Sequence, residues 1–249
     1  TRLPQEPAEK PLAYALHALR RDMARTLCTT DAPGGEICLR RDPALPPECF
    51  CLDADANILT LSAADVLGFV YGLFEISRRF LGVQPFWFWN DQTFSPRTEV
   101  EIPGGFHYAS TPARVRYRGW FINDETLLSH WKVNGSVEEP FRMAFEALLR
   151  CGGNMVIPGT GTEGLKHRQT AADMGLILTP HHAEPLGAPL FVQRHPDLEA
   201  KFSQYSDLFR ALWQEGINEQ KDLRVVWNIG FRGQGDRPFW ADDPQYDSA

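Results

Sequence analysis

The second half of the chain alternates short apolar runs with longer stretches of helical periodicity, and this alternation is the strongest constraint on its fold. Three of the apolar runs end abruptly in polar, chemically capable residues, at positions 117–125, 176–184 and 225–236. Short apolar runs bounded by Gly and Pro are typical of buried parallel strands. Polar groups at the carboxyl ends of such strands are where barrels and open α/β sheets place their chemistry. The pattern therefore predicts part of an enzyme.

The expected elements of this half follow one another regularly. Strands are predicted near residues 116–123, 154–158, 176–179 and 223–229, with helices over 137–151, 162–174 and 195–215. Alternating strands and helices predict a parallel sheet with right-handed crossovers. About four such repeats occupy residues 112–249, whereas a complete eightfold barrel needs roughly 250 residues. We therefore expect an α/β fold that contains the first half of a (β/α)8 TIM-type barrel and is truncated after it.

The first half of the chain has a different pattern and predicts a small α+β domain over residues 1–105. Apolar residues at helical spacing indicate helices over 11–28 and from Ser62 or Asp65 to Gly82. Short extended pieces are expected at residues 36–40, 48–52, 57–61, 86–89 and 98–102. Gly and Pro residues between 103 and 111 indicate a linker, after which the catalytic domain is expected over 112–249.

Charge and hydropathy exclude two classes of partner. The chain of 249 residues has a net charge of −7 and a pI near 5.5, so it lacks the basic surface that binding of nucleic acid requires. No apolar run approaches the roughly 20 residues of a membrane helix. The amino-terminal sequence has neither an apolar signal core nor an initiator Met, which predicts a removed targeting segment or an excised piece. Localisation and oligomeric state stay open.

Two patterns that suggest bound groups are interpreted structurally. Cys49 and Cys51 alternate with Phe50, but the five cysteines lack the spacing of a metal site and are interpreted as free thiols. Residues 159–164 fit GxGxxG literally, yet no acidic residue is well placed after a following strand, so nucleotide binding is not expected. We predict neither a metal nor a cofactor.

The strand ends supply groups that suit recognition of a sugar or of a carboxylate. Asp124 follows an apolar strand and offers a carboxylate for acid or base work, although Asp and Asn are also common helix caps. In His181 and His182, a neutral ring can donate at one nitrogen and accept at the other. Adjacent side chains on an extended segment point to opposite faces, so one His is expected to enter a pocket while the other anchors the loop. Arg232 stands between glycines and suits a carboxylate ligand, or a structural ion pair with Asp236.

Several of these stretches together resemble glycoside hydrolase family 115, the α-glucuronidases that act on glucuronoxylan. The matching stretches are RGWFINDE at 118–125, GNMVIP at 153–158, HHAEP at 181–185, GFRGQGD at 230–236, and, in the first half, GFVYGLFEIS at 68–77 and GVQPFW at 82–87. The resemblance covers most of residues 57–240. It departs from the family's His-His-Glu-Pro pattern at Ala183, which is an insertion here.

The resemblance implies an inverting glycosidase of xylan degradation that removes glucuronic or 4-O-methylglucuronic acid from glucuronoxylan or its oligosaccharides. Such an enzyme needs a general acid and a general base roughly 6.5–9.5 Å apart. The catalytic candidates are Asp124 and Glu184. The substrate-binding candidates are Asn123, Glu125, Asn154, His181, His182, Arg232 and Asp236.

Further carboxylates are expected on later strands of the barrel, so the chain alone is expected to be inactive. Two other functions stay open. One is a hexosaminidase-like glycosidase, which would need an Asp-Glu pair after the fourth strand. The other is a non-catalytic carbohydrate-binding protein.

Overall fold

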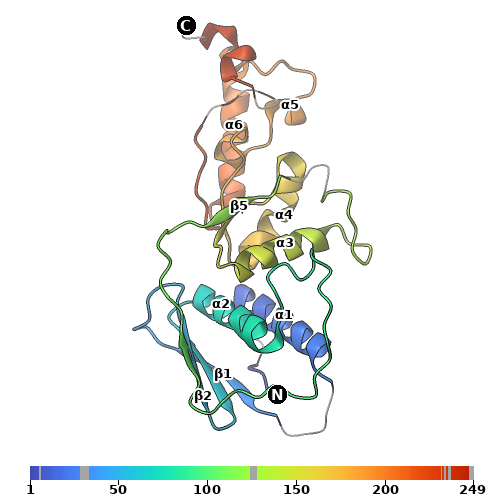
Figure 1. Cartoon of the computed structure of the whole chain (residues 1–249). Coiled ribbons are helices and arrows are strands. Elements are labelled where there is room, and N and C mark those ends of the chain that lie inside the picture. Colours follow the sequence, from blue (N-terminus) through green and yellow to red (C-terminus); the bar gives the residue numbers. More distant parts are fainter. Residues whose placement is uncertain are drawn as a thin grey trace. The chain divides into compact units, whose positions relative to one another are not determined.

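A computed structural model describes residues 1–5, 7–28, 34–123, 128–230, 232, 234 and 237–246. The side chains of residues 162 and 163 are outside this description. The chain divides into two compact units (Figure 1). Unit 1 contains Thr1–Arg118, Phe145–Gly153 and Asp173–Gly175, and unit 2 contains Gly119–Ala144, Asn154–Ala172 and Leu176–Ala249. Among the described residues, no helix has the length and apolar character needed to cross a membrane.

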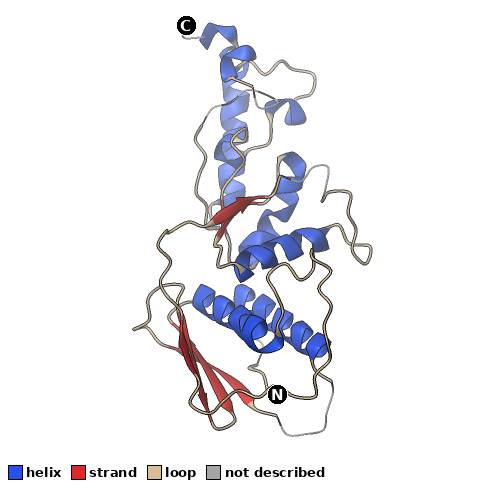
Figure 2. Cartoon of the chain, in the orientation of Figure 1, coloured by secondary structure: helices blue, strands red, loops and turns tan. Residues whose placement is uncertain are grey.

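Unit 1 is built on a four-stranded sheet with the order β1-β3-β2-β4. The strands are β1 Glu36–Arg41, β2 Phe50–Asp55, β3 Ile58–Ala63 and β4 His107–Ala109. β1 pairs parallel with β3, whereas β2 pairs antiparallel with both β3 and β4. Helices α1 Lys10–Thr26 and α2 Val66–Ile76 lie on one side of the sheet (Figure 2). The two helices and the strands β1, β2 and β3 were predicted from the sequence to within a few residues.

Helix α2 can lie close to the sheet because two glycines face it. A Cβ on Gly72 would stand 2.2 Å from a methyl of Leu61, and one on Gly68 would stand 2.5 Å from the carbonyl oxygen of Cys49. Asp65 begins the helix, since its side chain accepts a hydrogen bond from the Gly68 N–H. The helix continues through a π-helical turn, Ser77–Leu81, and ends at Gly82 in the left-handed conformation.

Three expected features of unit 1 differ in the structure. Residues 86–91 form turns, and residues 98–102 are not a strand. The segment expected to be a linker contains β4, which adds an edge strand beside β2. A strand of three residues is too short for alternation of apolar and polar side chains to reveal it.

Unit 1 also buries an ionic network that includes the second half of helix α3, Glu138–Arg150. The guanidinium of Arg150 is 2.5 Å from Asp22 and 2.8 Å from Glu146. Arg21 donates two further hydrogen bonds to Glu146, at 2.7 and 2.9 Å, and the Trp87 indole donates one at 3.1 Å. Burial alone would raise the pKa of Glu146, but the hydrogen bond from Arg21 and the charges of Arg150 and Arg21 outweigh it and hold that pKa at about 2.

Unit 2 contains the parallel sheet, with strand order β5-β6-β7 in its described residues. The strands are β5 Gly119–Phe121, β6 Met155–Ile157 and β7 Ile177–Leu178, and each adjacent pair is parallel. The helices after them are α3, α4 Gly161–Asp173, α5 Phe191–Arg194 and α6 Phe202–Gln220. The alternation of strands and helices and the parallel pairing were predicted from the sequence.

The strands of unit 2 are all shorter than predicted, and its last helix begins later than predicted. The fourth strand is reduced to one parallel bridge between Leu178 and Val225. The last helix begins at Phe202 instead of residue 195, and the separate short helix α5 precedes it. Pro196 explains this break, because the residue before a proline is driven away from helical geometry. Short 3-10 turns follow at Pro185–Gly187, Phe239–Ala241 and Pro244–Tyr246.

Candidate active site

The carboxyl ends of the parallel segments meet at one edge of the unit 2 sheet. The Ile122 N–H donates to the Ile157 carbonyl at 2.9 Å, and the Thr179 N–H donates to the Val156 carbonyl at 3.0 Å. The fourth segment joins in the same sense, because the Val226 N–H donates to the Leu178 carbonyl at 2.8 Å. The loops that follow these segments therefore leave the sheet at the same edge, where α/β enzymes place their sites.

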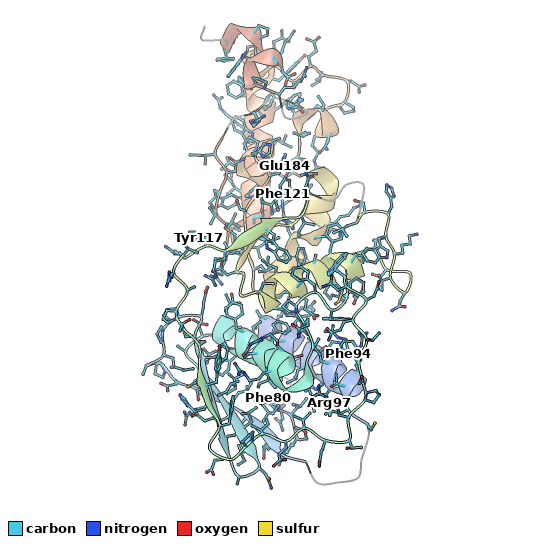
Figure 3. The ribbon with its side chains drawn as sticks, in the orientation of Figure 1. Phe80, Phe94, Arg97, Tyr117, Phe121 and Glu184 are labelled. Carbon is cyan, nitrogen blue, oxygen red and sulfur yellow. The ribbon has the colours of Figure 1, made fainter. Side chains whose placement is uncertain are left out.

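The two adjacent histidines lie against each other at this edge. Their ring centroids are 3.9 Å apart, and the His181 ring is also 5.3 Å from that of Phe121. Phe121 lies at the end of β5 (Figure 3). His181 is half-buried and His182 is exposed. The expectation that the two side chains point to opposite faces is wrong, because residues 182–184 form a turn and the chain is not extended here.

The backbone of His181 is held by two neighbours. Its carbonyl accepts hydrogen bonds from the Glu184 N–H at 2.9 Å and from the Asn228 side-chain amide at 3.0 Å. Asn228 also accepts from the Gly230 N–H at 2.8 Å. The Ala183 N–H donates to His181 Nδ1 at 3.3 Å. In the neutral ring this leaves Nε2 as the donor nitrogen.

Glu184 is buried beneath the same loop, with 3% of its surface exposed. Its carboxylate accepts a hydrogen bond of 2.5 Å from the Gly161 N–H, at the start of α4. Its other oxygen is 3.8 Å from the buried guanidinium of Arg168. Burial lowers the pKa of Arg168, and the negative charge of Glu184 opposes that shift. Glu184 therefore ties the loop after β7 to the beginning of α4.

This contact explains the glycine-rich segment at residues 159–164. Helix amino termini attract anions, because their first N–H groups lack partners within the helix. Here the anion at the start of α4 is the carboxylate of Glu184. Gly164 is required for close packing of the turn, since a Cβ there would stand 2.5 Å from the Gly159 carbonyl oxygen. The segment is thus a loop closed by the protein's own side chain.

The remaining predicted site residues are placed as follows. Asn123 is exposed directly after β5, and Arg232 is exposed in the loop after the fourth segment, where it pairs with Pro238 in an isolated bridge. Asn154 is 1% exposed and precedes β6. It therefore lies at the amino end of the strand, away from the edge that carries the histidines. Asp124, Glu125 and Asp236 lie outside the described residues.

Three residues that help build this edge are not among those predicted from sequence. Asn228 follows the apolar run of the fourth segment, just as the predicted candidates follow the other apolar runs. The same sequence signal could therefore have identified it. Phe121 belongs to the apolar strand itself, and Arg168 lies within a helix whose periodicity does not mark it. Their contacts depend on tertiary structure, which the sequence pattern does not contain.

Known proteins similar to this chain are carbohydrate-active enzymes. The model of glycosyl hydrolase family 115 matches residues 110–247. Among solved structures, a family GH115 4-O-methyl-α-glucuronidase with specificity for decorated arabinogalactans has a TM-score of 0.75 and 23% identity, over 95% of this chain and 36% of its own. A chitobiase of Flavobacterium johnsoniae has a TM-score of 0.56 and 14% identity, over 97% of this chain and 42% of its own.

These likenesses differ in what they establish. At such identities the two structures show a shared fold, and this chain spans little more than a third of the first of them. Among curated proteins, none is significantly similar in sequence. The family model matches more than half of the chain, including every loop at the carboxyl edge. The chain therefore belongs to glycosyl hydrolase family 115.

Proposed function

We propose that this chain is the amino-terminal part of an inverting α-glucuronidase that removes glucuronic or 4-O-methylglucuronic acid from xylan side chains. The observation that carries the proposal is the family match over residues 110–247, which includes the strand ends where the histidines and Arg232 lie. The likeness in fold to a GH115 4-O-methyl-α-glucuronidase supports it. The chemistry of these loops suits a sugar that carries a carboxylate.

In the proposed site each loop supplies a different contact with the substrate. The Arg232 guanidinium pairs with the uronate carboxylate, for which its planar donors are suited. The ring of His181 donates from Nε2 to a sugar oxygen, since its Nδ1 accepts from the chain. Asn123 and His182 are further contacts at this edge, and Glu125 and Asp236 remain candidates from the sequence alone. Asp124 supplies one of the two carboxylates that an inverting mechanism requires.

For Glu184 we propose a positioning role instead of a role as acid or base. A general acid must reach the glycosidic oxygen, directly or through one water. The Glu184 carboxylate is buried and faces Gly161 and Arg168. It thus orients the loop that carries His181. Asn154 is not part of the proposed sugar site, because it lies at the opposite end of β6.

We propose that β5, β6, β7 and the segment at Val225 are the first four strands of a (β/α)8 barrel. Their parallel order and the crossover helices support this architecture. In such a barrel the second carboxylate comes from a later strand. The assignment of residues 1–105 to an accessory domain and of 112–249 to the catalytic barrel stays part of this proposal.

The test is release of uronic acid by the natural protein, with its intact mass measured in parallel. Glucuronoxylan and a glucuronidated arabinogalactan are compared, because a structure of similar fold is described as specific for decorated arabinogalactans. We expect release from glucuronoxylan. Release only from arabinogalactan would support the proposed α-glucuronidase activity but contradict xylan as the substrate. Absence of release by a protein of 28.2 kDa would favour a non-catalytic carbohydrate-binding role.

A pair of arginine variants tests the uronate contact. Arg232→Ala is expected to raise KM for a uronic acid substrate at least about tenfold, the size of one lost charge-assisted contact. Arg210→Ala is the control, because Arg210 is exposed on α6 and pairs with Asp207. Equal KM values for the two variants would remove Arg232 from the site.

A further inference from the structure

Unit 1 contains a second cluster of reactive side chains, on the sheet face that α1 and α2 do not cover. Cys51 and Asp53 lie two residues apart on β2, and His107 on β4 stands directly opposite Asp53 in the antiparallel pairing. Successive side chains of a strand alternate between faces, so these three share one face of the sheet. One ligand atom from each lies within 4.8 Å of the other two.

The three side chains converge on a single point. His107 Nδ1 is 2.6 Å from a carboxylate oxygen of Asp53 and 4.0 Å from the sulfur of Cys51. Cys51 is diagonal to His107 across the strand pair, a spacing within reach of long side chains. The side chains of His107 and Asp53 are 61% and 45% exposed, so an ion can reach them from solvent.

We propose that Cys51, Asp53 and His107 form a zinc-binding site on this face of the unit 1 sheet. A thiolate, an imidazole and a carboxylate are the three ligand types that Zn²⁺ takes in proteins. Their mixture disfavours Mg²⁺ and Ca²⁺, which prefer oxygen ligands. Three protein ligands leave the fourth tetrahedral position to water.

Binding replaces the thiol proton with the metal. Cys51 binds a metal as the thiolate, so its thiol proton is released to solvent when Zn²⁺ binds. The neutral His107 ring binds through Nδ1 and carries its single hydrogen on Nε2, so it releases no proton. The divalent charge then offsets the two anionic ligands, which lie close together.

The plain alternative is a cross-strand hydrogen bond between Asp53 and His107 with an inert thiol nearby. Such pairs contribute a fraction of a kcal/mol in exposed sheets. The convergence of the Cys51 sulfur on the same ring nitrogen is what favours a metal over this alternative. The metal would also affect the fold, because β4 is a three-residue edge strand that pairs with β2. A metal ion bound by residues of both strands holds β4 against β2.

The first experiment titrates the whole chain with Co²⁺ and then displaces it with Zn²⁺. A bound thiolate gives a sulfur-to-cobalt charge-transfer absorption, which Cys51→Ser is expected to abolish. His107→Ala should weaken Zn²⁺ binding by more than about tenfold, the lower bound for losing even an outer-shell partner. Zn²⁺ should raise the Tm of the wild type and of neither variant.

Cys38→Ser is the matched control. Cys38 lies on the same sheet and the same face, since the register runs from Cys38 to Thr60 and from Thr60 to Asp53, but strand β3 separates it from Asp53. It should retain the charge-transfer band and the affinity. Equal loss in Cys38→Ser and Cys51→Ser, or a wild type that gives no thiolate band, would overturn the proposal. Circular dichroism establishes that each variant is folded before titration.

Discussion

The carboxylate of Glu184 and the backbone N–H of Gly161 meet at 2.5 Å, which joins the loop after β7 to the first turn of α4. This contact connects the loops that follow the adjacent strands β6 and β7. It gives the glycine-rich segment an internal anion, and it removes Glu184 from the surface where a sugar would bind. The geometry of the His181 loop therefore depends on a residue that need not touch the substrate.

Two substitutions of Glu184 test whether this residue has a structural, positioning role. Glu184→Ala removes the carboxylate that faces the buried Arg168 and should lower the free energy of unfolding by about 3 kcal/mol, at the low end for a broken buried pair. Glu184→Gln keeps an acceptor for Gly161 and should cost about 1 kcal/mol, the value of the lost charge at a helix terminus. Chemical denaturation measures both, with exposed Glu199→Gln as the control.

The activity of Glu184→Gln decides between the two roles. A positioning residue predicts reduced activity with an unchanged pH profile, because the acid and base remain in place. Loss of one limb of the pH profile at full stability would show instead that Glu184 is the acid or the base.

Gly164 should tolerate no side chain. A Cβ on Gly164 would approach the Gly159 carbonyl oxygen to 2.5 Å, whereas one on Gly104 would meet nothing within 4 Å. Gly164→Ala is therefore expected to destabilise the chain by about 1–3 kcal/mol, as overpacking does, while Gly104→Ala should be close to neutral. Thermal unfolding of the two variants side by side provides the comparison, and equal Tm values would contradict the packing described for this turn.

Asn228 should matter for activity through His181. Asn228→Asp removes the amide that donates to the His181 carbonyl but keeps an acceptor for Gly230. We expect kcat/KM for uronic acid release to fall about tenfold, as loss of one hydrogen bond of about 1.4 kcal/mol implies. Asn218→Asp, an exposed change on α6, is the control. A normal kcat/KM for Asn228→Asp would show that the His181 loop is held without this bond.

The ionic network of unit 1 predicts acid sensitivity. The pKa of Glu146 is lowered from 4.5 to about 2 in the folded chain. Because the folded value is the lower one, its stabilisation is complete above about pH 5 and is lost as the pH falls toward 2. The loss should be on the order of 3 kcal/mol. Denaturation between pH 7 and 3 should show this slope in the wild type and in Glu36→Gln, and a flatter one in Glu146→Gln. Equal slopes in all three would contradict the assignment.

How far the sequence predicts this structure depends on the range of the interactions involved. Helices α1, α2, α3 and α4 were predicted within a few residues, because their apolar periodicity and end signals such as Asp65 and Gly82 are local. The parallel sheet followed from the alternation of strands and helices. By contrast, β4 at His107 could not be predicted, since a three-residue edge strand is defined only by the strand that it joins.

The candidate site likewise combines features that local sequence signals predict with features that depend on residues distant in sequence. The sequence located the carboxyl edge and the histidines, because polar residues that end apolar runs mark strand ends. It did not predict that the two rings contact each other or that Glu184 turns inward toward Gly161. Both follow from a turn at residues 182–184 whose partners come from α4 and from the segment of Asn228, and these partners are distant in sequence.

The measurement that tests the central claim most directly is uronic acid release from glucuronoxylan by the natural protein and its Asp124→Asn variant. Both are first shown to be folded by circular dichroism. The account predicts release by the wild type and a loss of at least about a hundredfold in the variant, the lower range for a missing general acid or base. Equal release by the two proteins would exclude Asp124 from the chemistry. No release by the wild type from any glucuronidated polysaccharide would contradict the proposed function itself.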